Sequence, residues 1–257
     1  MIQWFGNKLC DAGFVINLNH REERLRRTFS ELESSNIEGV ERFEACMISE
    51  PFYSKYGCTQ SHIEIAKLQI ENNWEYVLYL EDDIISDFFY DYGTDNTKID
   101  KRKVSEEIIS NLNQMKPDVL WLGVRPESYT EKVSDCFVKP SITLMSHAYL
   151  GSLKYANFLI ENLKYSESNH FSYRWPIDFF ISQINVKNNW TLDKMENTNF
   201  FKNNDLKIFM TTPMIFNQGH SYSDLLDRDV NYKEWVEGCY SEYVNTNKMN
   251  INKFLNE

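Results

Sequence analysis

Short apolar runs alternate with amphipathic stretches along the first two thirds of the chain. Residues 14–18 (FVINL) are mostly apolar, and the charged stretch behind them repeats Leu25, Phe29 and Leu32 at helical spacing. This pattern predicts a buried strand that runs into an amphipathic helix.

The same alternation continues toward the C-terminus. Further strands are predicted at residues 41–46, 76–80, 119–122 and 145–150, with Gly123 closing the third of them. Further helices are predicted to begin at Ser61 as N-cap, to cover 104–115, and to start at Leu153. A short helical segment follows Pro176, and loops are predicted at 91–102 and 185–205. The fold class is therefore α/β, with a mainly parallel central sheet flanked by helices. We expect a single domain over 1–257 with a C-terminal tail from about residue 243.

Composition narrows the class of protein. With 257 residues, 42% of them hydrophobic and 25% charged, the chain can bury a substantial core. Its net charge of −11 repels phosphate backbones, so no nucleic acid is expected as the main partner. No run of some 18 apolar residues predicts a transmembrane segment, and residues 1–10 are too polar for a signal peptide. We therefore expect a cytoplasmic protein, and a virus-encoded protein in host cytoplasm fits equally.

The cysteines give no metal motif. The five residues are far apart and odd in number, with no C-x-x-C pair and no histidine at the spacing typical of zinc sites. We interpret them as reduced thiols, mostly in the core.

Three adjacent acids, Glu81, Asp82 and Asp83, come directly after the strand at 76–80. Open α/β sheets bind ligands at the carboxyl ends of their strands. Because adjacent carboxylates repel each other, a cation is expected to hold them, and hard oxygen ligands favour Mn²⁺ or Mg²⁺. Alternation along an extended chain points Glu81 and Asp83 to one side and Asp82 to the other. A solvated acidic loop explains the bare triplet equally well.

Several groups of residues occur in a specific order along the chain. They are residues 15–18 with Arg21, Arg24 and Arg27 behind them, Gly57-Cys58 followed by Ser61-His62, the block 78–84 with its acids, 118–123, 148–150, Pro176-Ile177-Asp178, and 213–224 with His220 and Ser223-Asp224. Together they resemble glycosyltransferase family 25, which includes bacterial lipooligosaccharide galactosyltransferases and collagen galactosyltransferases. The similarity spans roughly residues 14–227.

This resemblance implies a GT-A type fold and an inverting, metal-dependent transfer of a sugar, usually galactose, from a UDP-sugar to a hydroxyl of a glycan acceptor. The partners are then a nucleotide sugar and a glycan, and contact with a membrane would come through a lipid-linked acceptor. The sequence leaves open the sugar, the acceptor and the oligomeric state. A catalytically degenerate domain that binds a glycan or a protein partner is the alternative.

The resemblance also implies roles for particular residues. Asp83 takes the place of the main metal ligand of a DxD motif, and Glu81 either joins it or contacts the donor's ribose or a metal-bound water. His220 is a further metal ligand, although such a histidine is more often a surface residue. Asp178 is the catalytic base for the acceptor hydroxyl, against the alternative of a helix cap. The donor-binding residues are Asn17, Arg21, Arg24, Ser61, His62, Glu81, Asp82 and Gly123.

Structural alternatives exist for two of these groups. The arginines at 21, 24 and 27 form a basic stripe that could neutralise a diphosphate or could pair with Glu22, Glu23 and Glu31 on a solvated helix face. His62 could equally be a buried histidine held by a hydrogen bond.

Overall fold

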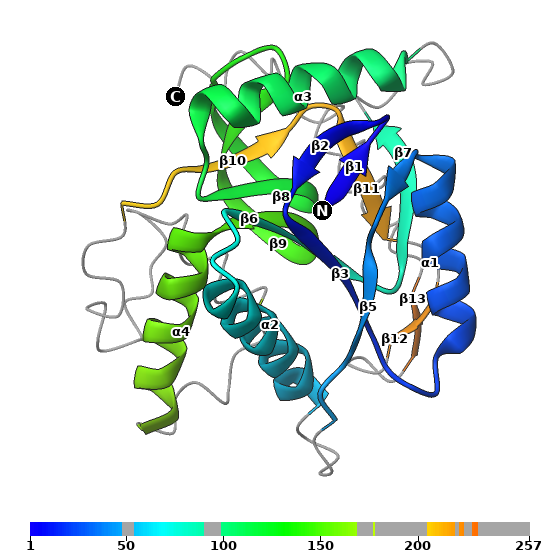
Figure 1. Cartoon of the computed structure of the whole chain (residues 1–257), viewed down its shortest axis with the longest axis vertical. Coiled ribbons are helices and arrows are strands. Elements are labelled where there is room, and N and C mark those ends of the chain that lie inside the picture. Colours follow the sequence, from blue (N-terminus) through cyan, green and yellow to red (C-terminus); the bar gives the residue numbers. More distant parts are fainter. Residues whose placement is uncertain are drawn as a thin grey trace.

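The computed structural model describes residues 1–47, 54–89, 99–168, 177, 205–218, 221–223 and 228–230. A six-stranded sheet with the strand order β10-β8-β9-β6-β3-β5 forms the centre (Figure 1). Its strands are β3 (Ala12–Asn17), β5 (Glu41–Glu44), β6 (Tyr76–Glu81), β8 (Val119–Lys132), β9 (Phe137–Ser152) and β10 (Ile208–Thr211). The described helices are α1 (Glu22–Ser34), α2 (Ser54–Glu71), α3 (Lys101–Met115) and α4 (Leu153–Ser168).

The sheet is mostly parallel. β3 pairs in parallel with both β5 and β6, and β10 pairs in parallel with β8. β9 runs antiparallel to both of its neighbours, β6 and β8. The α/β class and the mostly parallel sheet predicted from the alternation are therefore confirmed, while the β8–β9 hairpin was not predicted.

The two faces of the sheet bury different side chains because residues alternate along each strand. In β6, Val77 and Tyr79 pack into the cluster that includes α2 and α4, whereas Leu78 and Leu80 pack into the opposite cluster. In β8, Trp121 packs into the same cluster as Val77 and Tyr79, and Leu122 packs into the opposite cluster. α2 and α4 lie against each other on one face, and α3 lies over the other with the N-terminal hairpin (Figure 1).

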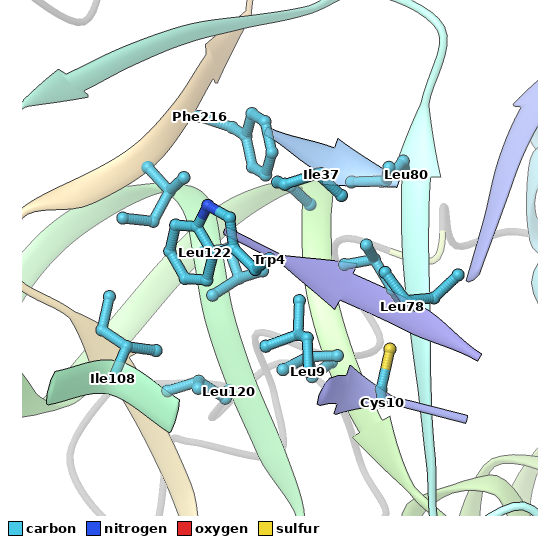
Figure 2. Close-up of a cluster of buried hydrophobic side chains, with 14 of the residues drawn as sticks. Trp4, Leu9, Cys10, Ile37, Leu78, Leu80, Ile108, Leu120, Leu122 and Phe216 are labelled. Carbon is cyan, nitrogen blue, oxygen red and sulfur yellow. The ribbon is translucent and has the colours of Figure 1, made fainter. Parts of the chain in front are cut away.

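A small antiparallel sheet completes the second cluster. Its strands are β1 (Ile2–Trp4), β2 (Asn7–Cys10) and β4 (Ile37–Glu38) in the order β2-β1-β4. Figure 2 shows Trp4 and Leu9 facing Leu120 and Leu122 of the large sheet. This hairpin was not predicted, although its turn holds Phe5 and Gly6 at positive φ, the conformation that glycine favours.

Two further pairs of strands form separate two-stranded sheets. β7 (Ile84–Phe89) pairs with β11 (Met214–Gln218), and β12 (Ser221–Ser223) pairs with β13 (Arg228–Val230). Among the described helices, none combines the length and the apolar character needed to cross a membrane.

The predicted start of the second helix is wrong. α2 begins at Ser54, and Ser61 lies inside it, where its hydroxyl donates to the carbonyl of Gly57. Serine is favoured at helix N-caps, but glycine within the first turns disfavours a helix, so the true start at Ser54 is not evident from the local sequence. Here a Cβ on Gly57 would lie 2.3 Å from the carbonyl oxygen of Cys46, so close packing explains the glycine.

The predicted end of the strand at residues 119–122 is also wrong. β8 continues through Gly123 to Lys132, and β9 begins at Phe137, ahead of the predicted residue 145. A Cβ on Gly123 would lie 2.5 Å from Nε2 of His147 and 2.7 Å from the carbonyl oxygen of Phe216. This glycine marks a close approach inside a strand, which sequence alone does not distinguish from a turn.

Candidate functional site

The acids lie where two parallel strands end. Ile16 of β3 is in register with Glu81 of β6, so Asn17 stands beside the turn formed by Asp82 and Asp83. The predicted position of the triplet at the carboxyl edge of the sheet is therefore confirmed. This edge is the usual ligand-binding position of an α/β sheet.

Asp82 faces inward and is held by several hydrogen bonds. Nδ2 of Asn17 donates to one carboxylate oxygen at 2.7 Å, and Nη1 of Arg24 donates to the other at 2.7 Å. The hydroxyl of Thr28 donates to the main-chain carbonyl of Asp82 at 2.8 Å. Arg24 and Thr28 are four residues apart in α1, so they share one face of that helix. Asp82 thus ties α1 and β3 to the end of β6.

Asp83 and Glu81 face the other way and share the amide of Gln218. Nε2 of Gln218 lies 3.3 Å from a carboxylate oxygen of Asp83 and 3.4 Å from one of Glu81. Nη2 of Arg24 reaches the second oxygen of Asp83 at 3.4 Å. These contacts agree with the predicted alternation of the triplet, and they are longer than those of Asp82.

Burial raises the pKa of Asp83 to about 6. Arg24 and Gln218 lower this pKa and Asp82 raises it further, but the loss of solvent outweighs the favourable contacts. A carboxylate in this position is costly to ionise without a further cation.

Gln218 reaches the acids through the pairing of β11 with β7. In that pairing Gln218 stands opposite Ile84, the residue that follows Asp83. Local sequence patterns do not predict this contact, because the partner of β11 lies more than 120 residues earlier. Oε1 of Gln218 is buried and has no hydrogen-bond partner among the described residues.

His62 is buried on the α2 side of the same edge. Its Nδ1 lies 2.7 Å from the hydroxyl of Tyr149, and its ring stacks on Tyr79 and Tyr149 with both centroid distances 5.7 Å. Burial lowers its pKa to about 3, so the imidazole is neutral near pH 7. The arrangement matches the structural alternative for this histidine. Ser61 accepts a hydrogen bond from the amide of Cys46 at 2.9 Å, so its hydroxyl joins α2 to the preceding segment.

Of the remaining predicted residues, Arg21 and Gly123 are described by the structure, and Asp178 and His220 are not. Arg21 is the N-cap residue of α1, and its carbonyl accepts a hydrogen bond from Nδ2 of Asn17 at 3.0 Å. Gly123 packs against His147, as described above, and a donor contact from it stays a prediction. Asp178 and His220 lie outside the described residues, as do the tail from 243 and all but the last residue of the predicted loop at 185–205, so these predictions stay predictions.

The side chains at the Asp83 position fit a hard divalent cation. Glu81, Asp83 and the amide oxygen of Gln218 supply the oxygen ligands that Mn²⁺ and Mg²⁺ prefer. The buried amide oxygen without a partner is consistent with this fit, because rotation of the amide would turn it toward the two carboxylates.

Comparison of the sequence with protein-family models and with characterised proteins gives no match. Among solved structures, a glycosyltransferase involved in glycosylation of the major capsid of PBCV-1 is similar, with a TM-score of 0.45 and 9% identity over 90% of this chain and 100% of that chain. A197 from STIV has a TM-score of 0.39 and 10% identity over 86% and 92% of the two chains. Mannose-1-phosphate geranyltransferase from Thermus thermophilus has a TM-score of 0.39 and 8% identity over 79% and 59%. These scores are too low to assign a family or a shared function.

Proposed function

We propose that this chain is a metal-dependent glycosyltransferase of GT-A type, related to family 25, that transfers a sugar from a UDP-sugar to a glycan hydroxyl. The observation that carries the proposal is the convergence of Glu81, Asp83 and Gln218 at the carboxyl edge of the sheet. The expected reaction, transfer of a sugar, comes from the resemblance of the sequence motifs to glycosyltransferase family 25.

The charge on the leaving diphosphate is the main obstacle in such a transfer. A bound Mn²⁺ or Mg²⁺ supplies Lewis-acid stabilisation of that charge. Asp83 and Glu81 hold the cation through their carboxylate oxygens, and Asp82 fixes the turn that presents Asp83. Arg24 lies at 3.4 Å from Asp83, within reach of the same region. Asp178 accepts the proton of the acceptor hydroxyl in this proposal.

The experiment that tests this function is calorimetric titration of UDP into the protein with and without Mn²⁺. We expect binding that requires Mn²⁺ and that weakens at least about tenfold in Asp83→Asn, since a main ligand carboxylate is lost. Asp135→Asn is the matched control, because Asp135 is an exposed acid that pairs with Lys132 in the turn between β8 and β9.

A screen of nucleotide sugars for metal-dependent hydrolysis then separates the two functional alternatives. Hydrolysis by the wild-type protein supports the transferase, and metal-dependent UDP binding without any hydrolysis or transfer favours the degenerate binding domain. Equal UDP binding in wild type and Asp83→Asn, or binding that ignores Mn²⁺, contradicts the proposed site.

A further inference from the structure

A second group of metal-binding side chains lies on the α2 side of the acids. The ligand atoms of Cys58, His62 and Glu81 all lie within 4.8 Å of one another. A point therefore exists within about 2.8 Å of all three atoms, compared with the bond lengths of about 2.0–2.3 Å found around zinc. Side-chain shifts of less than about 1 Å would close that gap.

The local structure places these three atoms together for identifiable reasons. Cys58 and His62 are four residues apart in α2, so they share one face of the helix. The first turns of α2 pack tightly against the preceding segment at Gly57, which fixes the position of Cys58. Glu81 is the last residue of β6, and it is half-buried, as is Cys58.

The orientation of the imidazole points to a ligand. Nε2 of His62 is buried and has no hydrogen-bond partner among the described residues, while Nδ1 contacts the hydroxyl of Tyr149. Metal-binding histidines commonly donate their second ring N–H to an oxygen in this way, which fixes the tautomer and aims the other nitrogen at the metal. A buried imidazole nitrogen without a partner otherwise carries an energetic cost.

We propose that Cys58, His62 and Glu81 form a Zn²⁺ site next to the carboxylate site at Asp83, with Glu81 shared between the two sites. A thiolate and an imidazole select zinc over Mn²⁺ and Mg²⁺, and three protein ligands leave a fourth position for water. Binding releases the thiol proton of Cys58 to solvent. The ion would join α2 to the end of β6 through one carboxylate oxygen of Glu81, which leaves the other oxygen and Asp83 to hold the donor's cation.

Cobalt(II) substitution of the full chain, after treatment with a chelator, tests this site. We expect one equivalent of Co²⁺ to produce a thiolate-to-cobalt charge-transfer band in the near ultraviolet, and Zn²⁺ to displace it. Cys58→Ser should lose the band and bind Zn²⁺ at least about tenfold more weakly. Cys46→Ser is the matched control, because Cys46 is also a half-buried free thiol near α2 but is not among the three ligands.

Two further variants keep the test decisive. Tyr149→Phe removes only the hydroxyl that contacts His62, so we expect the band to remain and the Zn²⁺ affinity to fall about 10–100-fold. Asp83→Asn should leave the band unchanged, which separates this site from the proposed UDP site. Absence of the band in the wild type, or equal Zn²⁺ affinity in wild type and Cys58→Ser, overturns the zinc site whatever UDP binding shows.

Discussion

Asp82 and Asp83 are adjacent in the sequence and both contact Arg24, but the protein holds them with contacts of different length. Asp82 accepts two hydrogen bonds of 2.7 Å and is only 7% exposed. Asp83 has contacts of 3.3 and 3.4 Å, and its pKa is raised to about 6. The hydrogen bonds of the first carboxylate are short, whereas the longer contacts of the second do not offset the loss of solvent. An acidic triplet can therefore combine a structural anchor with a candidate ligand residue directly beside it.

The largest effect on stability is expected when the carboxylate of Asp82, which anchors α1 and β3 to the end of β6, is removed. Asp82→Ala leaves Arg24 without its closest carboxylate, and the side chains of Arg24 and Asp82 are only 19% and 10% exposed. Loss of the closer partner from a largely buried ion pair costs up to about 3 kcal/mol, because Arg24 stays buried with its longer contact to Asp83. We expect the free energy of unfolding to fall by that amount in a urea titration followed by circular dichroism.

Asp135→Ala is the control for this prediction. Asp135 pairs with Lys132 at 2.9 Å, but its side chain is 94% exposed, so its unfolding midpoint should equal that of the wild type. If Asp82→Ala is as stable as Asp135→Ala, then Asp82 is not an anchor and the contrast with Asp83 fails.

The second prediction concerns the pH dependence that Asp83 produces. Its pKa is about 6 in the folded protein and near 3.8 in the unfolded chain. A carboxyl whose folded pKa is raised favours folding most below the unfolded pKa, and that contribution is lost as pH rises through the folded pKa. We expect a loss of roughly 2 kcal/mol between about pH 4 and pH 7.

Asp83→Asn isolates this contribution, because the amide does not titrate while the other carboxyls are unchanged. The difference in unfolding free energy between this variant and the wild type should therefore grow with pH. Mn²⁺ should reduce the difference at pH 7 by binding only the folded wild type. A difference that does not change with pH shows that Asp83 is compensated as well as Asp82.

Local sequence patterns predicted the parts of this region that depend on neighbouring residues. The strand at 76–80, the position of the acids at its carboxyl end and the side to which each acid points follow from short apolar runs and the geometry of an extended chain. The anchoring role of Asp82 could not be predicted, because Asn17, Arg24 and Thr28 come from a different strand and helix.

The same limit applies to contacts between distant segments. Gln218 reaches Asp83 only because β11 pairs with β7, and Cys58 and His62 reach Glu81 only because α2 packs against the sheet. No zinc pattern was visible, since the third candidate ligand lies 19 residues beyond His62 and belongs to a strand. Gly123 was misinterpreted for a related reason, because it allows close packing against His147 and Phe216 within β8 and does not end the strand.

The smallest effect comes from a single hydroxyl that supports the anchor. Thr28→Val keeps the shape of a fully buried side chain but removes the 2.8 Å hydrogen bond to the carbonyl of Asp82. Loss of a buried hydrogen bond costs about 1 kcal/mol, so the unfolding free energy should fall by that amount. Ser34→Ala is the control, since it deletes an exposed hydroxyl that bonds a carbonyl of the same helix at 2.8 Å.

The effect of Thr28→Val should also shrink when Asp82 is already alanine, because the turn that the Thr28 hydroxyl supports is then no longer held in place. Strict additivity of Thr28→Val and Asp82→Ala would show that the hydroxyl and the carboxylate act independently, and the anchor would then be the Asn17 and Arg24 contacts alone.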